Sequence, residues 1–247
     1  MPAKSELQFD KASKLIKSDI DYSIAVLSAT TLSSQLKITA EDAKQLAVTA
    51  WNAQWDCLLL GALFNCEVMC NLQSDKSISE LKNASYINVT NYELHAFRSQ
   101  NYTISERDEE WIKKYYEQAI KLLNNNIYST AVHAMASYRW HSIPRIKLAI
   151  LWSGIESLFN VSTEVSFRIS LYIAYFLNNH NEQEASNLFK KVKKLYNIRS
   201  SAVHGNEIKE DISSSVEESA HLLNQLIIKC AEIGSLPDLE KLIFRIP

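Results

Sequence analysis

Glycine and proline are scarce in this chain, with 4 of each among 247 residues, and this scarcity limits the folds that it can form. Average proteins contain about 7% glycine and about 5% proline. Sandwiches, barrels and propellers need many tight turns, and these two residues supply much of the turn geometry. The chain is therefore expected to form long helices joined by few corners, which is a mainly α fold.

The charges nearly balance, with 26 basic and 28 acidic side chains. A protein with so small a net charge has no overall positive field, so any binding of nucleic acid needs a local basic patch. The first residues are polar and mixed in charge, and the longest apolar stretch, residues 57–64, is shorter than the ~20 residues that cross a bilayer. We expect a cytoplasmic protein with no membrane partner.

Cysteine usage predicts neither a disulfide scaffold nor a zinc site. The four cysteines are Cys57, Cys66, Cys70 and Cys230. Cys66 and Cys70 form one CxxxC pair, and no second pair has the spacing of zinc ligands. We expect these side chains to act as small apolar residues, and the sequence predicts no metal ion or other cofactor.

Residues 1–100 are expected to form a smaller N-terminal α+β portion of unclear role. A helix is predicted over about 41–60 from apolar residues at helical spacing. Residues 64–72 and 86–97 alternate with a period of two and are rich in Val, Ile, Thr and Tyr, which predicts two strands. The polar residues 73–85 would link them.

Residues 101–247 are expected to form one helical domain. Ser105 followed by Asp108 is close to a capping box, and the asparagine run at 124–126 ends the helix that follows. Five more helices are predicted over about 128–140, 144–159, 163–177, 182–204 and 212–233. The helix that starts at Pro144 is apolar nearly all round, so it should be the central, buried one.

The helix over 182–204 carries a local basic run. Residues 187–204 contain no acid, whereas residues 205–218 contain five acids and one lysine. The basic residues are Lys190, Lys191, Lys193, Lys194 and Arg199. The run is either a solvated helix face or a surface that binds RNA.

Arg199 is unusual because it falls on the apolar stripe of its helix. A buried charge without a partner costs several kcal/mol, so Arg199 needs a carboxylate, a subunit interface or an anion-binding cleft. Glu156 occupies a matching position on the apolar helix from Pro144. We expect the two side chains to face each other, either as a site or as an ion pair that fixes helix register.

His204 follows Arg199 by five positions, which is about 140° around a straight helix. Gly205 should end or bend the helix there, so His204 could swing toward the end of Arg199. The alternative is that a histidine in this position only makes a favourable contact with the helix dipole.

These residues resemble a known family. Residues 195–205, LYNIRSSAVHG, are similar to the LYxxRSxxVHG block of the Apea-like group of the HEPN superfamily, whose signature is Arg-x4-His in a helical bundle. Residues 151–159, LWSGIESLF, resemble the LWxxxExLF helix of that group, and residues 167–174 resemble its next helix. The resemblance covers about residues 105–230, with the three blocks in the family's order.

The resemblance implies a dimeric HEPN-type helical bundle and, as in many members, a metal-independent endoribonuclease. Arg199 and His204 take the two signature positions, with Glu156 in support. Ser200 is the third catalytic candidate: it stands where active members most often have Asn or Asp, and its hydroxyl can still hydrogen-bond a phosphate. The chemistry agrees, because His can act as acid or base near neutral pH and Arg stabilises the charge that builds on a phosphate.

Three functions follow from the sequence, in order of preference. The first is an RNA-cleaving toxin or antiphage defence effector that acts by attack of the 2'-hydroxyl, works as a homodimer, and has an antitoxin or sensor as a possible partner. The second is a non-catalytic HEPN module that binds RNA, a nucleotide or a protein. The third is a helical interaction protein in which Arg199 and Glu156 are only a structural pair.

Overall fold

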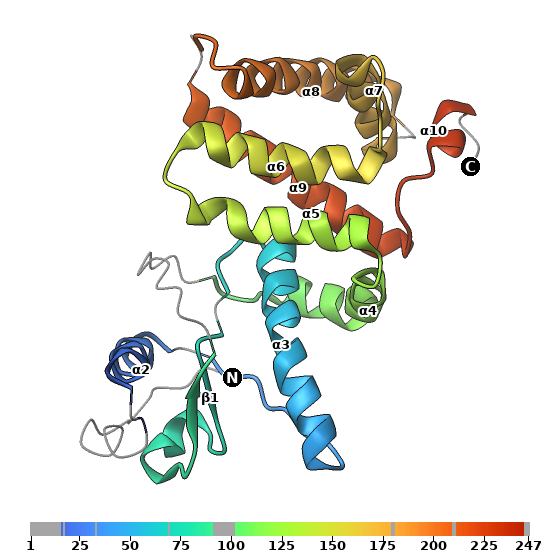
Figure 1. Cartoon of the computed structure of the whole chain (residues 1–247). Helices are drawn as coiled ribbons and strands as arrows, with labels where there is room; N and C mark the ends of the chain where they lie inside the picture. The colour runs from blue at the N-terminus through green and yellow to red at the C-terminus, as the bar shows by residue number, and fades with distance from the viewer. Residues whose placement is uncertain are drawn as a thin grey trace. The chain divides into compact units, whose positions relative to one another are not determined.

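The computed structural model describes residues 16, 18–32, 34–68, 70–90, 102–178, 181–208 and 211–244. Over these ranges the protein is mainly helical with a small antiparallel sheet (Figure 1), which confirms the predicted mainly α fold. The chain divides into two compact units, residues 1–57 with 68–101 and residues 58–67 with 102–247. The helix α3 (Ala43–Leu63) contributes residues to both units.

The N-terminal unit is small and mixed. Besides the first part of α3 it contains α2 (Asp19–Thr31), β1 (Leu72–Ser74), the 3-10 helix η1 (Ile78–Asn83) and β2 (Ile87–Val89). The two strands pair antiparallel with Gln73 opposite Asn88. Their inner face packs with α2 in a small core that includes Ile24, Ala25 and Val89.

The two strands predicted in this region are wrong in extent. Helix α3 continues to Leu63 and is followed by a turn in which Asn65 has a φ of 48°, so the strand predicted over 64–72 exists only at its last residue. β2 covers three residues of the strand predicted over 86–97, and residues 91–97 lie outside the described residues. The predicted polar linker contains η1, which buries Ile78 and Leu81.

The C-terminal unit confirms the predicted succession of helices to within a few residues. Its helices are α4 (Glu106–Leu122), α5 (Asn126–Ser137), η2 (Tyr138–Trp140), α6 (Pro144–Phe159), α7 (Val165–Leu177), α8 (Glu182–Val203), α9 (Ile212–Ile233) and α10 (Leu239–Phe244). Ser105 and Asp108 form a complete capping box at α4. Gly234 ends α9 in the left-handed conformation, with a φ of 75°. The short helix α10 was not predicted.

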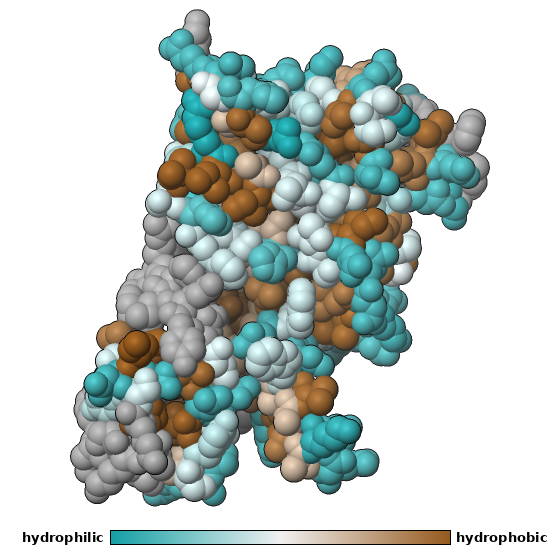
Figure 2. Space-filling model, viewed as in Figure 1, coloured by the Kyte–Doolittle hydropathy of each residue, from teal (hydrophilic) through white to brown (hydrophobic). Residues whose placement is uncertain are grey.

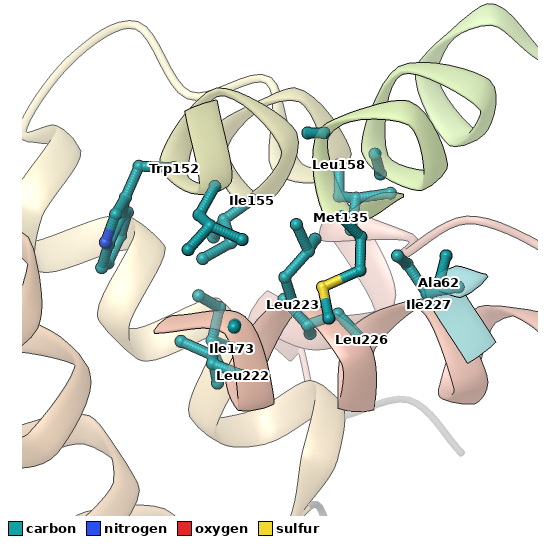
Figure 3. Close-up of a cluster of buried hydrophobic side chains, with 14 of the residues drawn as sticks. Ala62, Met135, Trp152, Ile155, Leu158, Ile173, Leu222, Leu223, Leu226 and Ile227 are labelled. Atoms are coloured by element: carbon teal, nitrogen blue, oxygen red, sulfur yellow. The ribbon is translucent and has the colours of Figure 1, made fainter. Parts of the chain in front are cut away.

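Helix α6 lies at the centre of this unit, as its all-round apolar sequence predicts. It packs against α5, α8 and α9. Ile155 on α6 and Leu223 on α9 lie in the shared core (Figure 3), and Nε1 of Trp152 donates to the hydroxyl of Ser219 on α9 at 3.1 Å. Gly154 allows the close approach, because a Cβ atom there would lie 2.9 Å from the Cβ of Ala134 on α5. This packing fixes the place of Glu156 opposite α8.

Candidate functional site

Glu156 on α6 and Arg199 on α8 form an ion pair. Nη2 of Arg199 lies 2.9 Å from Oε1 of Glu156 and donates a hydrogen bond to Oε2 at 3.0 Å. The two side chains are 19% and 29% exposed, so the pair is mostly buried but reaches solvent. The expectation that these residues face each other is therefore met.

Arg199 keeps donor capacity that Glu156 does not use. Its Nε is buried and has no hydrogen-bond partner among the described residues. A buried donor without a partner costs about 1–3 kcal/mol. The guanidinium carbon also lies 5.7 Å from the centre of the Tyr196 ring, and that ring meets Trp152 edge to face. Aromatic rings thus flank the guanidinium, and one of its donors is unused.

The burial that surrounds this pair acts on its ionisable groups. Burial raises the pKa of Glu156 above its ordinary value of 4.5, against the opposing effect of Arg199. Burial and the nearby Glu156 also raise the pKa of Tyr196. For the Glu156 carboxylate, the effect of removal from water on the pKa is therefore larger than the effect of the positive charge of Arg199.

His204 is the C-cap residue of α8 and is exposed. Its backbone N–H donates to the carbonyl of Ser200 at 3.0 Å, and Gly205 follows with a φ of 74°. The N–H of Asn206 then reaches back to the carbonyl of Ser201 at 2.9 Å, which closes the helix in a Schellman arrangement. The His204 side chain makes no hydrogen bond with a described residue, so its ring is available to a ligand.

The structure does not bring Arg199 and His204 together by a side-chain contact. Helix α8 is regular through Val203, so His204 stays about 140° around the helix and ~7.5 Å along its axis from Arg199. Ser200 is half-buried, and its position on α8 is nearer the His204 side. Its hydroxyl makes no hydrogen bond within the described part of the chain.

His204 instead shares a side of α8 with most of the basic run. At 100° per residue, Lys190, Lys193, Lys194 and His204 fall within about 100° of one another, and Arg199 lies at least ~120° from each. All four are exposed, and hydrophilic residues predominate over α8 along the upper edge of the view in Figure 2. The basic run and His204 thus form one surface, which we call the α8 outer face.

The four lysines of the basic run are not equivalent. Nζ of Lys191 lies 3.0 Å from Oε2 of Glu218 on α9, so its charge is already paired. Lys190, Lys193 and Lys194 make no ion pair with a described carboxylate, and Lys193 lies 5.9 Å from the centre of the Phe189 ring. Three of the four lysines predicted to bind RNA are therefore free to meet a phosphate.

Arg145, in the first turn of α6, is a residue of this site that the sequence analysis did not identify. Its Nη1 donates to the carbonyl of Ala202 at 3.1 Å, and its Nη2 donates to the carbonyl of Asn206 at 2.8 Å. A longer bond of 3.4 Å reaches the carbonyl of Ser201. One guanidinium thus holds both sides of the turn that carries His204, and it opposes the negative end of the α8 dipole.

No protein-family model, curated protein or solved structure matched this chain in the comparisons that we made. The resemblance to the HEPN superfamily stays a prediction that rests on the three sequence blocks. Among the described residues, no three His, Cys, Asp or Glu side chains gather so that they could hold a metal ion. No helix within those ranges has the length and apolar character to cross a membrane.

Proposed function

We propose that this chain is a HEPN-type endoribonuclease that cleaves RNA without a metal ion. The observation that carries the proposal is the α8 outer face, where an exposed histidine lies at the end of three lysines without carboxylate partners. RNA backbones bind such rows of cations through their phosphates. The proposed biological setting is a cytoplasmic toxin or antiphage defence effector that an antitoxin or sensor protein restrains.

The proposed chemistry needs three groups. A base takes the proton from the 2'-hydroxyl, an acid protonates the leaving 5'-oxygen, and a cation stabilises the phosphate as negative charge builds on it. His204 is suited to the first or second task because imidazole titrates near neutral pH. Arg199 is suited to the third, since a guanidinium stays charged and matches the oxygens of a phosphate with its planar array of donors.

A homodimer would supply what one chain lacks. Arg199 and His204 point to different sides of one α8, so one chain does not bring both groups to the same phosphate. A two-fold partner could set its own His204 beside Arg199 of the first chain, and two-fold dimers are the commonest oligomers. The lysines of two chains would then line one groove.

A second function, a non-catalytic module that binds RNA, a nucleotide or a protein partner, is favoured by a different observation. Glu156 already occupies one edge of Arg199, and Ser200 stands where active family members most often carry Asn or Asp. In this case the α8 outer face would still bind an anionic ligand, but no bond would be cut.

Substitution at the two signature positions tests the proposal. His204→Ala and Arg199→Ala should each abolish cleavage of tRNA and mRNA while the circular dichroism spectrum stays that of the wild type. His221→Ala, which removes an exposed histidine from α9, is the matched control and should cut normally. If wild-type protein binds RNA but leaves it whole, the second function is correct.

A further inference from the structure

Two cysteines that the proposed RNA site does not use lie together in the N-terminal unit. Cys57 is on α3 and Cys70 is in the segment that leads into β1, and both are half-buried. This segment is tied to α3 by side-chain hydrogen bonds. Gln73 donates to the carbonyl of Ala50 at 3.1 Å.

Thr90 makes a second connection between the same two elements. Gln54, one turn before Cys57 on α3, donates to the carbonyl of Thr90 at 3.3 Å. The hydroxyl of Thr90 in turn donates to the carbonyl of Cys70 at 2.7 Å. The backbone of Cys70 is thus held beside the turn of α3 that carries Cys57.

The spacing along the two elements agrees with this placement. From Ala50 to Cys57 a helix rises ~10.5 Å, and from Gln73 back to Cys70 an extended chain covers about 10 Å. Because Gln73 is fixed opposite Ala50, Cys70 comes opposite Cys57. The hydrogen bonds and the rise therefore place Cys70 beside Cys57, whatever the ionisation of the two thiols.

The two thiols also affect each other's ionisation. A hydrogen bond between the two sulfurs lowers the pKa of Cys70 and raises the pKa of Cys57, and Thr90 lowers the pKa of Cys70 further. Burial opposes the effect at Cys70. The thiolate is the reactive form of cysteine. Cys70 is therefore suited to react first with an oxidant, and Cys57 to react second with the oxidised Cys70.

We propose that Cys57 and Cys70 are a redox-active pair that forms an intramolecular disulfide when the protein meets a peroxide. The inference goes beyond the proposed RNA cleavage and does not depend on it. The bond would link α3 to the β1–β2 hairpin within the N-terminal unit.

The chemistry balances in two steps. The Cys70 thiolate attacks one oxygen of hydrogen peroxide, the O–O bond breaks, and sulfenic acid and hydroxide form. The sulfur of Cys57 then attacks the sulfenic sulfur, an S–S bond forms, and hydroxide leaves as water with the proton of the Cys57 thiol. Two thiols and one peroxide thus give one disulfide and two waters, and a small dithiol reverses the change.

The other two cysteines are not suited to this reaction. Cys230 is buried on α9, and burial raises its pKa to about 12. Burial also raises the pKa of Cys66, more than the charge of Arg139 lowers it. Both should remain mostly protonated thiols at neutral pH and react slowly.

Alkylation after mild oxidation tests the pairing in the full chain. Native protein is treated with hydrogen peroxide, denatured, and alkylated with N-ethylmaleimide, and its intact mass is measured. We expect two of the four cysteines to escape alkylation, with all four alkylated again after dithiothreitol. Trypsin alone cannot map the bond because no Lys or Arg lies between Lys44 and Lys76, so the digest also needs cleavage after Glu67.

Three serine variants separate the possible bonds. Cys57→Ser and Cys70→Ser should each lose the protected pair, whereas the matched control Cys66→Ser should keep it in full. Loss of the pair in Cys66→Ser would place Cys66 in the bond and overturn the proposal. Alkylation of all four cysteines after peroxide treatment of the wild type would overturn it as well.

Discussion

At the scale of single residues, Arg145 connects the fold to the proposed chemistry. It binds carbonyls on both sides of His204, so its guanidinium is committed to the backbone of the turn. A guanidinium can span two such acceptors, whereas an ammonium group binds as a point charge. Arg145 is therefore a positioning residue for His204.

Substitution of Arg145 should separate RNA cleavage from RNA binding. In Arg145→Met we expect the cleavage rate to fall at least ~10-fold, because His204 is no longer held at its place, while RNA affinity changes little. The free energy of unfolding should fall by about 1–3 kcal/mol with the lost charged hydrogen bonds. Arg145→Lys should recover part of the stability. An unchanged cleavage rate in Arg145→Met would contradict the positioning role.

The Glu156 carboxyl predicts a dependence of stability on pH. Its pKa is raised in the folded protein, so between its ordinary and raised values the folded state binds more protons than the unfolded state. The contribution of Glu156 to the free energy of unfolding should therefore decrease as pH rises through that window. Glu156→Gln should remove this slope when urea unfolding is followed as pH rises from the ordinary pKa of 4.5. If the free energy of unfolding of the wild type and of Glu156→Gln changed equally with pH, the raised pKa of Glu156 would be contradicted.

At the scale of helices, α8 contains a matched control for its outer face. Lys194 has no ion pair with a described carboxylate, whereas Lys191 is paired with Glu218. The two are three positions apart on one helix, so their substitutions disturb the fold to similar extents. They differ in the charge available to RNA.

The salt dependence of RNA binding should separate these two lysines. Each phosphate contact with single-stranded RNA contributes about 0.7 to the slope of log affinity against log salt. Lys194→Gln should therefore lower the slope by about 0.7, and Lys191→Gln should leave it nearly unchanged. Equal losses in the two variants would show that the α8 outer face does not discriminate between them.

The helical part of the fold could be predicted because its signals are local. Ser105 with Asp108, Pro144 and Gly234 each mark a helix end through a single turn of backbone. The strands could not be predicted in the same way. Residues 64–68 alternate in polarity, yet they form a turn directly after the end of α3, in which Asn65 has a φ of 48°, so their alternation does not reflect a strand.

The candidate site was predictable only in part, for a related reason. Glu156 and Arg199 could be paired from the sequence because each is a charge on the apolar stripe of its helix. Burying either charge alone is costly, and contact between the two reduces both costs. The role of Arg145 could not be predicted, because its partners are backbone carbonyls. Their positions depend on where and how α8 ends, which the side chains of the sequence do not reveal. The direction of His204 also depends on how regularly α8 continues to Val203.

At the scale of the whole molecule, the proposal depends on assembly. Each chain presents Arg199 and His204 on different sides of α8, so a composite site needs two copies. Light scattering at micromolar concentration should give the mass of a dimer. A monomer whose cleavage rate per chain is independent of dilution would exclude the composite site.

Mixing two inactive variants tests the composite site directly. When Arg199→Ala and His204→Ala chains are mixed in equal amounts, half of the dimers are mixed, and one of the two sites in each mixed dimer has both groups intact. Cleavage should return to about a quarter of the wild-type rate if sites form across a two-fold axis. No recovery, with subunit exchange shown by a tagged chain, would mean that each site lies within one chain.

The most direct measurement is the mapping of RNA ends after incubation of purified protein with total RNA in EDTA. A base, an acid and a cation that act on the 2'-hydroxyl and phosphate need no metal ion. We therefore expect cleavage in the chelator, with 2',3'-cyclic phosphate or 3'-phosphate ends, and none with His204→Ala. RNA that stays whole, cleavage that returns only with magnesium, or cleavage by His204→Ala equal to that of the wild type would contradict the proposed function.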